Sequence, residues 1–143
     1  MTFIPVNFDE AVEASAVPAG RYDLQIVAAE VKQSGPNSAN PGRDMLVFQV
    51  GFEDNSLNAP NIRHFVSLPH PDDEGTKGQT KALMLKRFLV AFDVPFESNG
   101  IDTDSICFEA IGHTASNVEV VQDIGQDGTS VYNRINLPRL PRE

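Results

Sequence analysis

The order of its apolar segments is the feature that most constrains the fold of this 143-residue chain. Strand-like runs cover Gly20 to Gln33, Arg43 to Glu53 and Asn61 to Pro69. A stretch with helical spacing follows, from about Gln79 to Val94. Further strand-like runs end the chain: Asp104 to Ala115, Asn117 to Asp123 and Thr129 to Leu137. A period of two residues is typical of half-buried strands, and a period near 3.6 is typical of an amphipathic helix.

This β-β-β-α-β-β order predicts a mainly β domain, a five-stranded Greek-key barrel of the OB type with one α-helix between strands three and four. OB barrels bind oligonucleotides or oligosaccharides on the face of strands two and three and on neighbouring loops. Such a fold hosts many functions, so the order predicts architecture and not activity. We expect one domain over residues 20–143. In the lead-in, residues 1–19, we expect Phe3, Ile4 and Phe8 to dock on the barrel.

Alternation within the strands assigns residues to the inner or outer face of the barrel. In the first strand the alternation slips at residues 27–29, which predicts a β-bulge. In strands two and three, the set with the larger apolar volume is assigned to the core: Leu46, Phe48, Val50, Phe52, Ile62, Val66 and Leu68. The helix, with Thr80 as its expected N-cap, presents one apolar stripe to the barrel: Ala82, Leu85, Phe88, Leu89 and Phe92. Residues 125–128 predict a hairpin turn between the last two strands.

Composition narrows the class of protein. No apolar run approaches the ~20 residues that span a bilayer, so we expect no membrane association. Residues 1–15 lack the basic flank and continuous apolar stretch of a signal peptide. Cys107 is the only cysteine, which excludes an internal disulfide and fits the reducing cytoplasm. It lies in an apolar run, where a buried and inert thiol is the expected state.

The sequence contains no motif that indicates catalysis. It has no nucleophile elbow, phosphate-binding loop, dinucleotide fingerprint or HExxH motif. The possible zinc ligands match no compact zinc pattern: His64, His70, Cys107 and His113. We therefore expect a protein that is not an enzyme and that holds no metal or cofactor.

A mixed aromatic and basic face is the remaining candidate for function. Proteins that bind single strands combine cations that follow the backbone with aromatic rings on which bases stack. The residues assigned to such a face or its rim are Lys32, Arg43, Gln49, Arg63, Phe65, Tyr132 and Arg134. The alternative for each is an ordinary role, with Phe65 in the core and the arginines solvated. His64 falls on the inward set, where a hydrogen-bonded structural histidine is the expected role.

The net charge of −9 argues against binding a polyanion, because affinity for nucleic acids depends largely on Lys and Arg. The acidic residues lie mainly in predicted loops and termini, whereas arginines lie in the strands. Fields of exposed charges fade over roughly 8 Å at physiological salt, so a local basic groove can persist in an acidic protein.

Several short sequence motifs, which together span nearly the whole chain, are similar to those of a known protein family. They are Pro18-Ala19-Gly20-x-Tyr22-x-Leu24-x-Ile26, Gly42-x-x-x-Leu46-x-Phe48, Leu83-x-Leu85-x-Arg87-Phe88-Leu89-x-Ala91-Phe92, and the closing Asn133-Arg134-Ile135-x-Leu137-x-Arg139-Leu140. The lead-in Asn7-Phe8-Asp9-Glu10 looks similar too. With these motifs the chain resembles a group of bacteriophage single-stranded-DNA-binding proteins found among replication and recombination genes.

The resemblance implies sequence-independent binding of single-stranded DNA in the cytoplasm of an infected host cell. Many such binders end in an acidic tail that recruits other proteins, but this chain ends with three arginines and one glutamate in its last ten residues. The expected partners are single-stranded DNA, phage or host replication and recombination proteins, and a second copy of the chain. The alternative function is a protein-interaction module of the same machinery that has little affinity for DNA.

Overall fold

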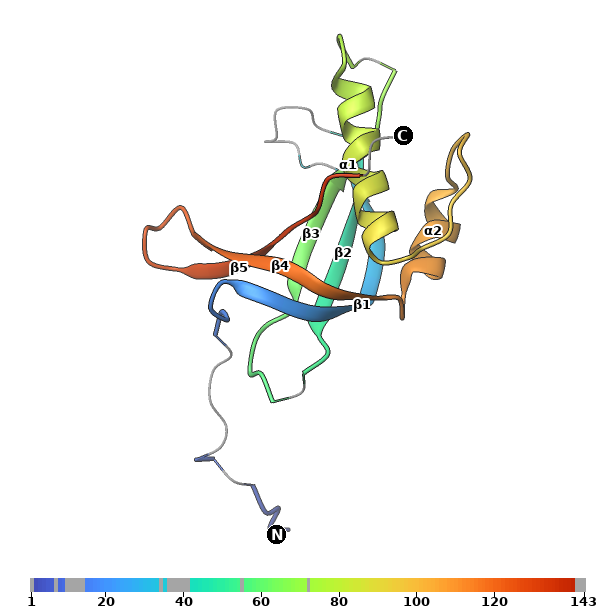
Figure 1. Ribbon diagram of the computed structural model, residues 1–143. Helices are drawn as coiled ribbons and strands as arrows, with labels where there is room; N and C mark the ends of the chain where they lie inside the picture. The colour runs from blue at the N-terminus through green and yellow to red at the C-terminus, as the bar shows by residue number, and fades with distance from the viewer. Residues whose placement is uncertain are drawn as a thin grey trace.

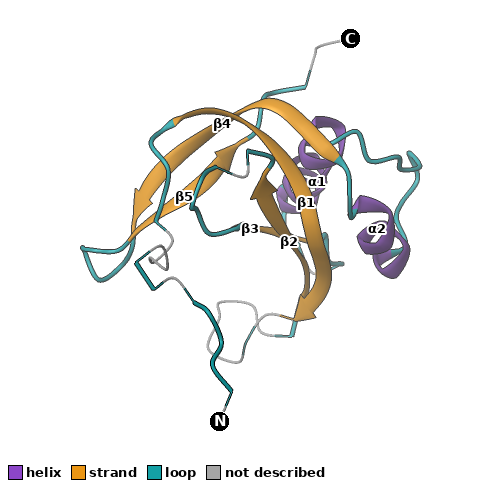
Figure 2. Ribbon diagram, turned by 90° about the horizontal axis from the view of Figure 1, so that it is seen from below, coloured by secondary structure: helices purple, strands orange, loops and turns teal. Residues whose placement is uncertain are grey.

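A computed structural model describes residues 2–6, 8–9, 15–33, 35, 42–54, 56–71 and 73–140. Five antiparallel strands form one sheet in the order β3-β2-β1-β4-β5. The strands are β1 (Gly20–Gln33), β2 (Asp44–Phe52), β3 (Ile62–Ser67), β4 (Thr114–Ile124) and β5 (Val131–Asn136). The sheet curls into a partly open barrel (Figures 1 and 2), which confirms the predicted mainly β architecture and is consistent with an OB-like fold.

Strand β1 is the longest strand, and it pairs with β4 on one side and with β2 on the other, which allows a single sheet to curl. Its first part pairs with β4 as far as Gln25, and most of its length pairs with β2. The register with β2 shifts between Ile26 and Ala28, which confirms the predicted bulge. A bulge bends its strand and increases the local twist, so β1 serves both sides of the barrel.

Two helices, α1 (Lys77–Ala91) and α2 (Thr103–Ala110), follow β3, where the sequence predicts one. The predicted strand over residues 104–115 is wrong, because α2 occupies most of that range. The alternation of Phe108 and Ala110 is overridden by helical spacing of the buried residues Ile106, Cys107 and Ala110, which leaves Phe108 81% exposed. None of the described helices has the length and apolarity needed to cross a membrane.

Helix α2 begins at a side-chain cap, whereas the residue before α1, Thr76, makes no side-chain cap hydrogen bond. The side chain of Asp102 accepts a hydrogen bond from the backbone N–H of Ser105 at 3.0 Å, the geometry of an N-cap. This hydrogen bond also lowers the pKa of the Asp102 carboxyl. Helix α1 begins after Thr76, one turn before the predicted cap at Thr80, whose hydroxyl instead donates to the Thr76 carbonyl.

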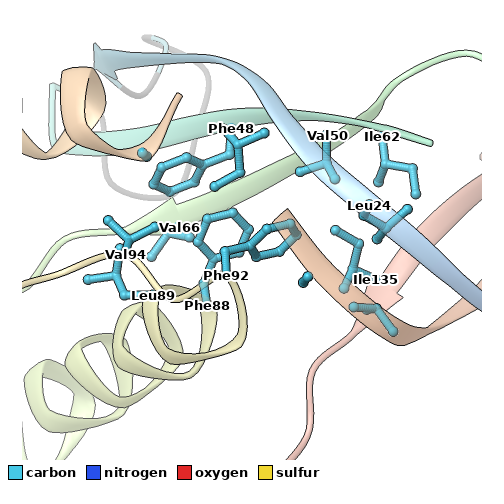
Figure 3. Packing of buried hydrophobic residues seen from close by; sticks show 14 of the residues in the cluster. Leu24, Phe48, Val50, Ile62, Val66, Phe88, Leu89, Phe92, Val94 and Ile135 are labelled. Atoms are coloured by element: carbon cyan, nitrogen blue, oxygen red, sulfur yellow. The ribbon is translucent and has the colours of Figure 1, made fainter. Parts of the chain in front are cut away.

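The predicted apolar stripe of the helix packs against the inner face of the sheet (Figure 3), except for Ala82, which is exposed. The ring of Phe88 stacks on Phe48 of β2 at 4.2 Å between centroids and lies 4.7 Å from the ring of Phe92. These three side chains are fully buried, with Leu85 and Leu89 beside them in the core. The predicted core residues of β2 and β3 are buried or pack against the core, so their assigned face is confirmed.

Predictions at the two ends of the chain have mixed outcomes. The last hairpin forms as predicted, with the Gly125 N–H donating to the Ser130 carbonyl. The expected docking of Phe3, Ile4 and Phe8 on the barrel is wrong, because all three are at least 71% exposed and their segment leads away from it (Figure 1). Nearly all of the loop predicted over residues 34–42 lies outside the described residues.

The part of the lead-in that does pack is Val17, whose backbone is held by side chains of the last hairpin. The Val17 N–H donates to Asn133 Oδ1, and the Val17 carbonyl accepts from Asn133 Nδ2, both at 2.9 Å. Gln122 Nε2 donates to the same carbonyl at 2.8 Å. These bonds satisfy buried backbone groups next to the first strand. Further back, the Ser15 N–H donates to the Asn58 carbonyl at 3.1 Å.

Candidate nucleic-acid interface

The barrel is open between β3 and β5, the two edge strands of the sheet. A groove of about 840 Å³ lies between these strands and is bordered by Met84 and Arg87 of α1. Of the seven residues that the sequence assigns to a binding face, four line this groove: Arg63, Phe65, Tyr132 and Arg134. The curl of the sheet therefore brings together side chains from opposite halves of the chain.

Two exposed aromatic rings contribute to the apolar lining of the groove, beside aliphatic side chains such as Met84. Phe65 of β3 is 55% exposed and Tyr132 of β5 is 50% exposed. Each precedes a buried residue, Val66 and Asn133 respectively, because successive side chains of a strand point to opposite faces. Phe65 therefore lies on the outer face, as assigned, and is not a core residue.

The described residues that line the groove include three arginines and one aspartate, a net charge of +2 in a chain of net charge −9. Arg134 Nε donates to Asp123 Oδ2 at 2.6 Å. This hydrogen bond raises the pKa of Arg134 above its already high ordinary value. Within the described part of the chain, Arg63 and Arg87 form no ion pair. The groove is thus a basic site on an acidic protein.

His64 connects the groove to the core. Its ring stacks on Phe88 with 4.9 Å between centroids, and it also lines the groove. Desolvation by burial lowers the pKa of His64 from 6.5 to about 4, so the ring is neutral at pH 7. The inward position assigned to it is correct, but a ring stack holds it rather than the expected hydrogen bond to another described residue.

Lys32 and Arg43 lie at the other end of the sheet, away from the groove. The register pairs Lys32 with Met45 of β2, whereas Arg63 pairs with Gln49. Six residues of strand separate Arg43 from the level of Gln49, which corresponds to about 20 Å. The residues that the sequence assigns to one binding face therefore lie in two separate places. Gln49 is half-buried and pairs with Arg63, but it does not line the groove.

The side chain of Arg43 takes part in a local cluster of charges. Arg43 Nη1 contacts Asp73 Oδ1 at 3.1 Å, and Lys81 Nζ contacts the same oxygen at 2.7 Å. The hydrogen bond from Lys81, followed by that from the His70 N–H, lowers the pKa of Asp73 to about 2. Because this cluster joins the start of β2 to α1, Arg43 is engaged in holding the fold. Lys32, near Glu30 on the exposed end of β1, has no such role.

Sequence reasoning did not assign two charged groups of the groove, Arg87 and Asp123. Arg87 lies in the predicted helix directly before the buried Phe88. A positive charge next to the apolar stripe could have indicated that this end of the helix borders a charged site. Asp123 is opposite Tyr132 in the β4–β5 register, so an aligned hairpin would have placed it near Arg134.

Comparisons with known proteins identify no family for this chain. A scan against models of protein families gives no match, and a search of curated proteins gives none either. Among the described residues, no group of histidine, cysteine or acidic side chains is arranged to hold a metal ion. Any functional conclusion therefore depends on the groove itself.

Proposed function

We propose that the protein binds single-stranded DNA, without sequence preference, in the groove between β3 and β5. The observation that carries the proposal is the lining of this groove: half-exposed Phe65 and Tyr132 together with Arg63, Arg87 and Arg134. Aromatic rings stack on any unpaired base, and arginines neutralise the backbone, which is the combination that single-strand binders use. The resemblance to bacteriophage proteins supports a role in DNA replication or recombination in the cytoplasm of an infected cell.

Single strands fit this site better than a duplex. A half-exposed ring gains a stacking partner only where the faces of the bases are accessible, and paired bases hide those faces. Sequence independence is expected because every base has a π-face on which a ring can stack. The excess of basic residues is local, so binding should weaken steeply as salt screens it.

A second candidate function is a protein-interaction module. Strands β3 and β5 are both edge strands that border the same groove, and an edge strand can pair with an extended peptide. A peptide bound in this way would complete the barrel by backbone hydrogen bonds. The acidic net charge of the chain favours this alternative over DNA binding.

Fluorescence anisotropy with labelled oligonucleotides tests the leading proposal. The wild-type protein should bind homopolymer and mixed single strands with similar affinity and bind a duplex of equal length more weakly. Replacing Arg63 with Ala should weaken binding to all sequences and reduce the salt slope by about 0.7, the contribution of one phosphate contact on a single strand.

Lys32→Ala is the matched control, because it removes one exposed positive charge that lies outside the groove. Its affinity should equal that of the wild type. If the wild-type protein has no affinity for single strands even at about 20 mM salt, where screening is weak, the proposal is wrong and the peptide-binding alternative takes its place.

A further inference from the structure

Arg87 is the one arginine of the groove that comes from a helix. It follows Met84 by three residues, so both side chains lie on the same face of α1 and line the groove. The residue is partly buried. Its Nε is enclosed by protein and has no hydrogen-bond partner within the described part of the chain.

A buried N–H donor without a partner, such as Arg87 Nε, costs folding free energy. Arginine keeps its charge at every accessible pH, so it cannot avoid the cost by losing a proton. Buried N–H groups are normally paired, and a neutral side chain of similar length would fill the same space without the penalty. Stability therefore does not explain a cation at this position.

The surroundings of Arg87 indicate what would bind it. Among the described residues, Asp123 is the only acidic one that lines the groove, and it is engaged with Arg134. Arg63 adds a further positive charge, and His64 is neutral near pH 7. An anion that enters the groove would meet a guanidinium whose donors have a fixed fork geometry suited to phosphate.

We propose that Arg87 binds a backbone phosphate of the strand that occupies the groove. This inference rests on the proposed function. The phosphate contact then comes from α1, while the rings that stack on bases come from β3 and β5. The strand runs through the opening between the two edge strands, beside α1, rather than across the outer face of β2.

The test compares the wild type with Arg87→Met, which keeps length and apolar volume but removes the charge. Affinity for a phosphodiester oligonucleotide should fall about tenfold at about 100 mM salt, and the salt slope should decrease by about 0.7. Affinity for an oligonucleotide with an uncharged methylphosphonate backbone should not change. The melting temperature of the unbound variant should equal or exceed that of the wild type, because an unpaired buried group has been removed.

Lys86→Met is the matched control, since Lys86 is the adjacent residue of α1, is exposed and does not line the groove. It should bind both oligonucleotides as the wild type does. Arg87→Lys, which keeps the charge and loses the fork, should have an intermediate affinity.

Three results would overturn the inference, and they are distinguishable. If Arg87→Met binds the phosphodiester strand as the wild type does, the inference is wrong and the proposed function stands. If its affinity and melting temperature fall together, Arg87 has a structural role instead. If the wild type binds no single strand, the proposed function and this inference both fail.

Discussion

Two groups of aromatic side chains in this barrel have opposite environments. Phe48, Phe88 and Phe92 are stacked together and fully buried between the sheet and α1. Phe65 and Tyr132 are half exposed and lie beside arginines on the two edge strands. The same class of side chain is therefore buried in the core in one region of this barrel and left half exposed beside positive charges in the other.

His64 lies between the two groups. Its ring stacks on Phe88 of the buried group and also lines the groove that Phe65 and Tyr132 border. A change at this residue can therefore affect both the core and the groove.

The largest expected effect follows from removing the central ring of the buried group. Phe88→Ala should lower the free energy of unfolding by about 3–5 kcal/mol, because it deletes a buried ring that contacts two others and leaves a cavity. Denaturant unfolding monitored by circular dichroism measures this change. Phe65→Ala is the matched contrast and should cost less than about 1 kcal/mol. Equal stability losses in the two variants would contradict the comparison.

The next effect is a pH dependence of stability that comes from His64. Its pKa is about 4 in the folded protein and 6.5 when unfolded, so the unfolded chain binds the proton first as pH falls. The contribution is complete above pH 6.5 and is lost as pH decreases toward 4. At about 1.4 kcal/mol per unit, stability should fall by about 2 kcal/mol between pH 7.5 and 5.

His64→Gln should remove this dependence, and unfolding curves at several pH values provide the measurement. The remaining histidines, His70 and His113, serve as the background in both proteins. A wild type and a variant with parallel pH profiles would show that the ring is not held neutral by burial.

Tyr132→Ala tests the exposed group. It should weaken binding of single-stranded DNA by about 1–3 kcal/mol with the salt slope preserved, since stacking releases no counterions. Its melting temperature should change little. Anisotropy titrations over a range of salt measure both quantities, and Phe108→Ala, which removes an exposed ring outside the groove, is the control. Full stability together with full affinity would exclude Tyr132 from the site.

The smallest expected effect concerns Asp123, which holds Arg134 within the groove. Asp123→Asn should raise affinity for single strands about two- to fivefold, because the net charge of the groove increases and Arg134 becomes available to phosphate. Glu109→Gln makes the same change of net charge on the exposed face of α2 and should have little effect. If both variants bind equally more tightly, net charge rather than the Asp123–Arg134 pair limits binding.

The errors of sequence reasoning have identifiable physical causes. Alternation over a few apolar residues predicts a strand in the region of Phe108, but the cap at Asp102 and the spacing of the buried residues produce α2. Phe3 and Phe8 were expected to dock because they are apolar, yet packing requires a complementary surface, which a sequence does not display. In both cases the local sequence is compatible with two structures: strand or helix near Phe108, and docked or exposed side chains in the lead-in.

In β2, β3 and most of α1, the sequence by itself determined which side chains point inward and which point outward. Periodicity predicted the core residues of β2 and β3, the stripe of α1, the bulge in β1 and the last hairpin, because local sterics set the direction of side chains. The outward positions of Phe65 and Tyr132 were predicted in the same way.

Only the tertiary structure decided which outward residues lie together. The curl of the sheet brings β3 and β5 to one groove, adds Arg87 from α1, and leaves Lys32 and Arg43 at the far end. The physical reason is that curling depends on twist and packing summed over the whole barrel, whereas alternation depends only on adjacent residues.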